Sequence, residues 1–149
     1  MSRPHLEVSV GILINEMKEI LIAKRPLQKY GGGFWEFPGG KIEKDEKVSQ
    51  ALYRELEEEL GVKIDLNHTT FLGRTEHIYP EFIFQSHVFI VRYWHGTPKP
   101  LEGQELVWTQ QFQFDHYSFL PGCQKIIELL NLKTEIKETT QSLDSGLIV

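Results

Sequence analysis

The sequence predicts an α/β fold, because strand-type and helix-type spacings of apolar residues both occur in a chain of 149 residues. In the N-terminal segment LEVSVGILI, apolar residues alternate from Leu6 to Ile14, which is the period of a half-buried strand. Farther along, Val48, Leu52 and Leu56 recur at every fourth position and predict an amphipathic helix. A chain of this length is the size of one domain with its own hydrophobic core.

The first predicted strand leads through a polar turn into a second one, EILIAKR, which ends at Arg25. The next segment, PLQKYGGG, contains three consecutive glycines, so we expect a mobile surface loop there. The helix should span about residues 47–60. Asp45 is the best candidate for its N-cap, and Gly61 suits the C′ position just beyond its end.

The second half of the chain predicts two long strands, one short strand and one packing helix. The segments TTFLGRTEHIY and FIFQSHVFIVRYW form the long strands, separated near Pro80, and ELVWT forms the short one after the loop HGTPKP. Pro121 suits the first position of a helix in PGCQKIIELLN. We therefore expect one domain over residues 1–132, followed by a polar, flexible tail over residues 133–149.

Composition and charge exclude several classes of protein. Hydrophobic residues make up 40% of the chain, but no apolar run is long enough to cross a bilayer and no signal peptide is evident. We therefore expect a cytoplasmic protein without a membrane partner. The single cysteine, Cys123, excludes an internal disulfide. The net charge of −5 disfavours binding to a nucleic-acid polymer, so a phosphate-containing partner would need a cation at its site.

The segment GKIEKDEKVSQALYRELEEELGV concentrates carboxylates on the predicted helix, where Glu55, Glu58 and Glu59 share one face. Like charges at this spacing destabilise an isolated helix by roughly 0.2–0.5 kcal/mol per pair, and a bound divalent cation would remove that cost. Mg²⁺ takes oxygen ligands and keeps several waters, so three carboxylates, water and a substrate phosphate form a suitable set. Arg54 precedes Glu58 by one helical turn and can hold its carboxylate in place.

Most charge runs on helices are solvated faces without a special role, and the alternative interpretation of this segment is such a face. The spacing of the whole segment argues against it. The residues in question are Gly40, Glu46, Arg54, Glu55, Leu56, Glu58, Glu59, Gly61 and Val62. This pattern resembles the signature of the Nudix hydrolase family and matches it at every fixed position.

The resemblance implies an α/β/α sandwich in which a mixed β-sheet lies between helices. It also implies hydrolysis of a nucleoside diphosphate linked to a further group, with Mg²⁺ or Mn²⁺ as the cofactor and a metal-bound water as the nucleophile. In that family the metal ligands would be Glu55, Glu58, Glu59 and the backbone carbonyl of Gly39, and Glu46 and Arg54 would support these ligands.

Outside this signature the chain is most similar to the MutT branch, whose members convert 8-oxo-dGTP to the monophosphate and pyrophosphate. The similarity spans about residues 7–130 and includes VGILIN, EFPGGKIE and LEGQELVW. MutT-like enzymes carry a glutamate in the last of these segments that reaches the metal site, and Glu102 occupies that position here. Its alternative interpretation is an exposed loop residue. Lys41, directly after the glycine pair, is a candidate phosphate contact or a solvated lysine.

For the nucleotide pocket, the resemblance implies roles for Arg25, Phe37 and Glu81, although Phe37 is equally suited to the core. Tyr30 stands where the branch has a histidine in its mobile loop. The branch recognises oxidised guanine with an asparagine, whereas this chain has Cys123 there. A thiol cannot make the paired hydrogen bonds of an amide, so either Gln124 or the backbone takes over or the preferred base differs.

Three other hypotheses remain open at this point. The chain could hydrolyse ADP-ribose, a dinucleoside polyphosphate or a pyrimidine triphosphate, or it could be a non-catalytic module that binds nucleotides. It could also carry an acidic helix without any ligand, in which case Mg²⁺ and nucleotide would not stabilise it. In the first two cases the partner is a small nucleotide, bound by a monomer or a homodimer.

Overall fold

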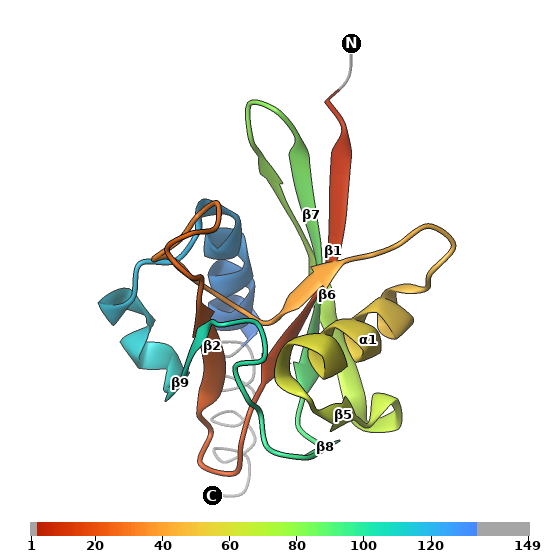
Figure 1. The fold of residues 1–149 in the computed structure, drawn as a ribbon, viewed down its shortest axis with the longest axis vertical. Helices are drawn as coiled ribbons and strands as arrows, with labels where there is room; N and C mark the ends of the chain where they lie inside the picture. The colour runs from red at the N-terminus through yellow and green to blue at the C-terminus, as the bar shows by residue number, and fades with distance from the viewer. Residues whose placement is uncertain (1–2, 134–149) are drawn as a thin grey trace, which may run out of the picture.

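A computed structural model describes residues 3–133 of the chain, and its centre is a mixed four-stranded sheet (Figure 1). Two neighbouring strands, β1 and β7, run parallel, whereas β4 and β6 pair antiparallel with them at the edges. The sheet order β4-β1-β7-β6 comprises Gly39–Lys41, His5–Leu13, Ile83–Val91 and Thr69–Ile78. The predicted mixed sheet is therefore confirmed.

Two smaller antiparallel sheets complete the strand content of the described residues. The first has the order β3-β2-β9 and comprises Trp35–Glu36, Ile20–Lys24 and Glu105–Thr109. The second pairs β5 with β8, which are Lys63–Ile64 and Trp94–His95. The predicted strands at the start of the chain and at ELVWT are confirmed, and FIFQSHVFIVRYW divides into β7 and the short β8.

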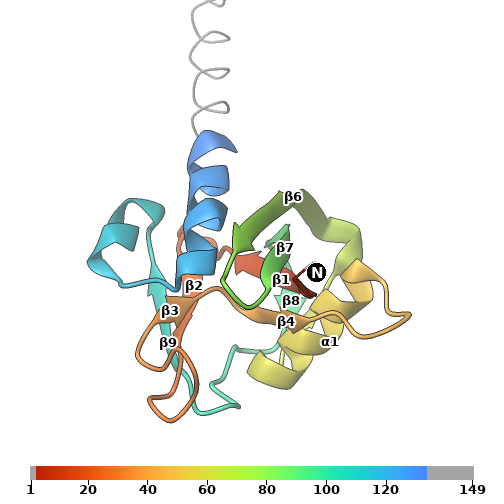
Figure 2. The same ribbon diagram turned by 90° about the horizontal axis from the view of Figure 1, so that it is seen from above.

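Helices cover both faces of the central sheet (Figures 1 and 2). Helix α1, Val48–Leu60, packs its apolar stripe against one face of β1 and β7, where Leu52 and Leu56 join a core with Phe89. The helical residues 124–133 lie on the other face, where Ile126 packs with Val88. This arrangement is the expected α/β/α sandwich.

Strand β1 is more deeply buried than its alternating pattern predicts. We expected one exposed face, yet every residue from Val8 to Leu13 is buried. The reason is that β1 is an interior strand: Val8 and Val10 face one core, whereas Ser9 faces α1 and donates its hydroxyl to the Val48 carbonyl at 2.7 Å. Because Ser9 is polar but buried, the sequence of β1 alternates like that of a strand with one solvent-exposed face, although both faces are buried.

The ends of α1 are set by local hydrogen bonds. The N-cap is Lys47, and the prediction of Asp45 is wrong, because Asp45 lies in a turn with φ of 64° and the Lys47 amide donates to the Gln50 side chain at 3.1 Å. At the other end the prediction is confirmed. Gly61 has φ of 71°, and its amide donates to the Glu57 carbonyl at 2.9 Å.

Short 3-10 helices connect the remaining elements, namely η1 (Leu66–His68), η2 (Gln111–His116) and η3 (Pro121–Cys123). Pro121 opens η3, and the chain continues as an α-helix over residues 124–133. The predicted tail lies, after its first residue, outside the described residues. Within residues 3–133, no helix combines the length and apolar character needed to cross a membrane.

Candidate active site

The glycine pair before the acidic helix brings the chain close to the carboxylates of α1. Gly39 has φ of 150°, and a Cβ atom there would overlap the Ser9 carbonyl. A Cβ atom on Gly40 would overlap the carboxylate of Glu55. Only glycine permits this approach, so the pair is required for β4 to lie directly against the acidic face of α1.

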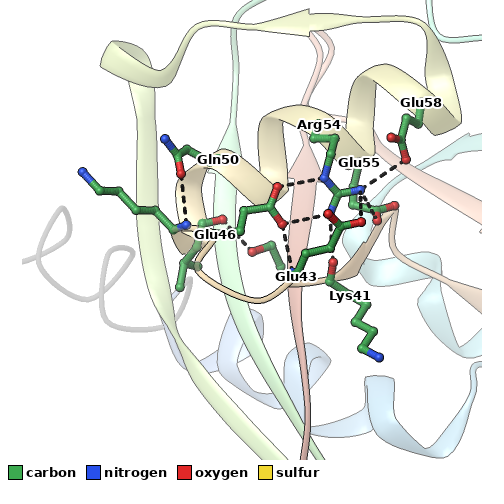
Figure 3. Close-up of polar contacts among 10 residues, drawn as sticks. Lys41, Glu43, Glu46, Gln50, Arg54, Glu55 and Glu58 are labelled. Carbon is green, nitrogen blue, oxygen red and sulfur yellow. Dashed lines mark hydrogen bonds and ion pairs between the residues drawn. The ribbon is translucent and has the colours of Figure 1, made fainter.

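Arg54 is the centre of a hydrogen-bonded network on that face (Figure 3). Its guanidinium binds Glu46 through two bonds, from Nε at 2.8 Å and from Nη2 at 2.9 Å. It also donates from Nη1 to Glu55 at 2.9 Å and to Glu58 at 3.3 Å, and from Nη2 to the Lys41 carbonyl at 3.0 Å. Arg54 therefore ties the loop after β4 to two of the three glutamates of α1 that are predicted metal ligands.

The three glutamates of this face occupy different environments. The side chain of Glu58 is 58% exposed, whereas that of Glu55 is 15% exposed, although both contact Arg54. Glu59 turns away from Arg54, and one of its oxygens accepts the Gly39 amide at 3.0 Å. Within residues 3–133, no three Asp, Glu, His or Cys side chains form a group placed to hold a metal ion. The cationic group that Glu55 and Glu58 share is the Arg54 guanidinium, and only the contact with Glu58 follows from helical spacing.

Burial and neighbouring charges hold Glu59 largely protonated. Burial is the main cause, and the carboxylates of Glu102, Glu55 and Glu36 add to it, so the pKa of Glu59 rises from 4.5 to about 9. Burial also raises the pKa of Glu55, whereas the bonds from Arg54 oppose that rise. The same guanidinium lowers the pKa of Glu46 to about 2. Electrostatically, Glu59 is the least favourable place for a negative charge on this helix.

A small polar pocket of about 180 Å³ lies over Glu59 and Gly39. The ion pair between Arg25 and Glu36, with 3.3 Å between Nη1 and Oε2, forms part of its wall. Glu102 lines the pocket from the loop before β9. Gln104 anchors that loop, because its side chain accepts the Glu102 amide at 2.8 Å and donates to the Glu59 carbonyl at 3.1 Å.

A larger apolar pocket of about 410 Å³ adjoins the polar one. The two share Arg25, Glu36, Phe37 and Gly39 as a common wall. The rest of the larger pocket is built mainly from β1, the β6–β7 turn and η3, with Leu6, Val8, Val10, Tyr30, Gly40, Lys41, Tyr79, Phe82, Phe84, Leu120, Gly122, Cys123 and Ile126 as its lining. An acidic pocket therefore opens beside an apolar one of a size that suits an aromatic ring.

The family model described as NUDIX domain matches residues 5–130. The chain belongs to the Nudix family. An 8-oxo-dGTP diphosphatase of Haemophilus influenzae is 36% identical over 130 residues, covering 87% of this chain and 94% of that protein. A CTP pyrophosphohydrolase of Escherichia coli is 35% identical over 119 residues, covering 80% of this chain and 87% of that protein.

The fold agrees with that of solved Nudix proteins. A structure from work on MutT of Aliivibrio salmonicida and Vibrio cholerae has a TM-score of 0.66 and 30% identity, and it covers 83% of this chain and 92% of that one. The protein is thus a Nudix pyrophosphohydrolase, and enzymes of this family generally depend on a divalent metal ion and act on small nucleotides.

The residues around the polar pocket fit such an ion in their chemistry. Glu55, Glu59 and Glu102 provide carboxylate oxygens and Gly39 provides a carbonyl, which are the hard oxygen ligands that Mg²⁺ prefers. The like charges that raise the pKa of Glu59 are also the charges that a cation would neutralise. A Nudix metal site at this place is consistent with both observations.

The substrate residues predicted from the sequence fall into three groups. Arg25 and Phe37 line both pockets, and Phe37 also stacks on Phe119 at 5.3 Å, so it is at once a core residue and a pocket residue. Lys41 and Cys123 line the larger pocket. Glu81 is exposed in the β6–β7 turn and is not among the residues that line either pocket.

Cys123 is buried, and this burial raises the pKa of its thiol to about 12. The side chain therefore stays protonated at neutral pH and adds only a weak hydrogen-bonding group to the apolar wall.

Sequence reasoning missed Glu36, Gln104 and the aromatic residues of the β6–β7 hairpin, Tyr79, Phe82 and Phe84. Glu36 stands between the buried Trp35 and Phe37 in the segment FWEFPGG, and strand alternation places it on the opposite face from both, so the spacing gave no signal of a pocket role. The hairpin aromatics also carry no such signal, because their pocket forms only where they meet residues of η3 that are distant in sequence.

Proposed function

We propose that the protein hydrolyses a nucleoside triphosphate to the monophosphate and pyrophosphate, with Mg²⁺ as the cofactor and 8-oxo-dGTP as the leading substrate. Mn²⁺ is an alternative ion. The observation that carries the proposal is the common wall of the two pockets at Arg25, Glu36, Phe37 and Gly39. A nucleotide with its base in the apolar pocket would extend its phosphates past this wall toward Glu59.

The residues around the polar pocket have two proposed roles, namely holding the metal ion and positioning the residues that hold it. Glu55, Glu58, Glu59, Glu102 and the Gly39 carbonyl would hold the metal, which when bound supplies an activated water and neutralises phosphate charge. Arg54 holds Glu55 and Glu58 in place, and Glu46 fixes Arg54 through two short bonds.

The cationic side chains near the wall would bind the phosphates. Arg25 and Lys29 line the polar pocket, and Lys41 lines the larger one beside Gly40. Each carries a positive charge, that of Arg25 being paired with Glu36, and the hydrogen bonds of the Arg54 guanidinium to other side chains go to Glu46, Glu55 and Glu58 rather than to these residues.

Two similar proteins of known activity suggest two candidate substrates for this chain. Similarity to the H. influenzae 8-oxo-dGTP diphosphatase over most of both chains favours 8-oxo-dGTP. CTP is the second candidate, because a CTP pyrophosphohydrolase is similar to nearly the same extent and Cys123 lacks the amide with which the MutT branch recognises oxidised guanine.

The test is pyrophosphate release in Mg²⁺ from 8-oxo-dGTP, dGTP, CTP and ADP-ribose. We expect 8-oxo-dGTP to give the highest kcat/KM of these four substrates. Glu57→Gln, which removes an exposed carboxylate from the same helix, should keep the wild-type order of substrates. A higher value for CTP would select the second candidate. Release from none of the triphosphates would refute the proposal.

A further inference from the structure

Tyr79 lies in the turn between β6 and β7, where one backbone hydrogen bond and two ring contacts hold it. Its amide donates to the Phe82 carbonyl at 2.8 Å, which closes the turn. The ring stacks on Phe82 with 4.8 Å between centroids and 28° between planes, and it meets the edge of His77 at 4.4 Å. A side chain with so many contacts loses little freedom when a ligand arrives, so it suits a recognition role.

The hydroxyl of Tyr79 is held in one hydrogen-bonding state. The Gly122 amide donates to its oxygen at 3.0 Å, which takes one lone pair of that oxygen. A phenol has one proton to donate, and within residues 3–133 that proton has no hydrogen-bond acceptor. Burial raises the pKa of the Tyr79 hydroxyl, so the proton is retained at neutral pH. The Tyr79 hydroxyl proton is therefore available for a hydrogen bond to an acceptor on a ligand.

The rest of the pocket near Tyr79 offers little competition for a polar group on a ligand. The lining side chains beside Tyr79 are apolar apart from Cys123, which is a weak donor, and the charged Lys41 is an exposed residue of β4. Arg25 and Glu36 stand at the opposite boundary, because they also line the polar pocket. Tyr30 is 85% exposed and lies on the rim. A base inserted between these boundaries would meet one strong neutral donor, the Tyr79 hydroxyl.

We infer that Tyr79 is a specificity-determining residue that donates its hydroxyl proton to a carbonyl oxygen of the base, and that the site favours keto bases over their amino counterparts. An amino group at the same position would present a second donor to the phenol proton. The phenol oxygen would accept from that amino group only weakly, because the Gly122 amide already takes one lone pair and the other is delocalised into the ring. This inference rests on the proposed nucleotide hydrolysis and adds the chemical class of base.

The test compares substrates that differ by one keto-for-amino exchange, namely dITP with dATP and UTP with CTP. The wild-type enzyme should have the higher kcat/KM for the keto member of each pair, by roughly three- to tenfold for one neutral hydrogen bond. Tyr79→Phe keeps the ring and its stacking but removes the donor, so both ratios should fall toward one. The matched control is Tyr93→Phe, because Tyr93 is 59% exposed and lines neither pocket.

Two results would overturn the inference while leaving pyrophosphate hydrolysis intact. One is a wild-type preference for the amino members, and the other is an unchanged keto preference in Tyr79→Phe. Calorimetric binding of IMP, AMP, UMP and CMP gives a second measure that does not depend on turnover. Keto selectivity in binding without hydrolysis would support the role of Tyr79 and refute the proposed function, whereas equal binding of each pair by the wild-type protein would refute the role of Tyr79.

Discussion

Without divalent metal, the protein should lose thermal stability as the pH rises from 6 to 8, and Glu59→Gln should abolish most of that loss. In the folded chain the pKa of Glu59 is raised from 4.5 to about 9. Between these values the folded carboxyl is protonated, whereas the same group in the unfolded chain is ionised. The folded state thus holds one more proton, and its stability is full below the lower pKa and declines until the pH passes the upper one.

The size of the effect follows from this window. One extra proton in the folded state lowers the free energy of unfolding by about 1.4 kcal/mol per pH unit, or about 2.7 kcal/mol from pH 6 to 8. In a domain of this size each kcal/mol moves Tm by about 2–4 °C. The metal-free wild-type protein should therefore melt about 5–11 °C lower at pH 8 than at pH 6.

Differential scanning calorimetry in a chelator would measure these melting temperatures, with Glu57→Gln as the control because it removes an exposed carboxylate from the same helix. The control should keep the wild-type dependence on pH. Excess Mg²⁺ should restore much of the lost stability at pH 8, since a cation stabilises the ionised carboxylate. An equal slope in Glu59→Gln and wild type would show that Glu59 is not the group responsible.

Three further predictions concern the site. Glu55→Gln should lower kcat in Mg²⁺ by about 100-fold while the protein stays folded, because a metal ligand is lost whereas the glutamine oxygen can still accept from Arg54, and near-normal turnover would refute the assignment. Cys123→Asn should raise the ratio of kcat/KM for 8-oxo-dGTP over dGTP by about tenfold, and an unchanged ratio would mean that this position does not contact the base. Gln104→Met removes both bonds that anchor the Glu102 loop while keeping the side-chain volume, so kcat should fall by about tenfold and the Mg²⁺ requirement should rise. Unaltered kinetics and metal dependence would contradict this anchoring role.

The elements that could be predicted are those whose pattern is local. Helix α1 follows from its stripe of Val48, Leu52 and Leu56, and its end follows from Gly61, whose left-handed conformation was foreseeable from residue type. The start of α1 was misplaced because a turn with positive φ at Asp45 competes with a capping role, and the choice between them depends on how the loop returns from β4. The burial of β1 was underestimated because its neighbours are distant in sequence.

In the site, the pairing of Arg54 with Glu58 follows from helical spacing, and the structure contains that contact. The separate environment of Glu59 does not follow from it, because spacing says nothing about the Gly39 amide or about Glu102 and Glu36. The lining of the larger pocket could be inferred only in part, through Arg25, Phe37, Lys41 and Cys123.

By itself, the sequence determined the family of this protein, because the spacing of its glycines, glutamates and Arg54 specifies a Nudix signature, in which the glutamates are the proposed ligands of a cation. Only the tertiary structure decided which carboxylate is buried and which aromatic residues form the apolar pocket. The physical reason is that desolvation and pocket shape depend on elements far apart in the chain. The pKa of Glu59 rises mainly because its carboxyl is buried where β4 lies against α1, and the Tyr79 hydroxyl, which has no acceptor within residues 3–133, is placed in the pocket by its contact with η3.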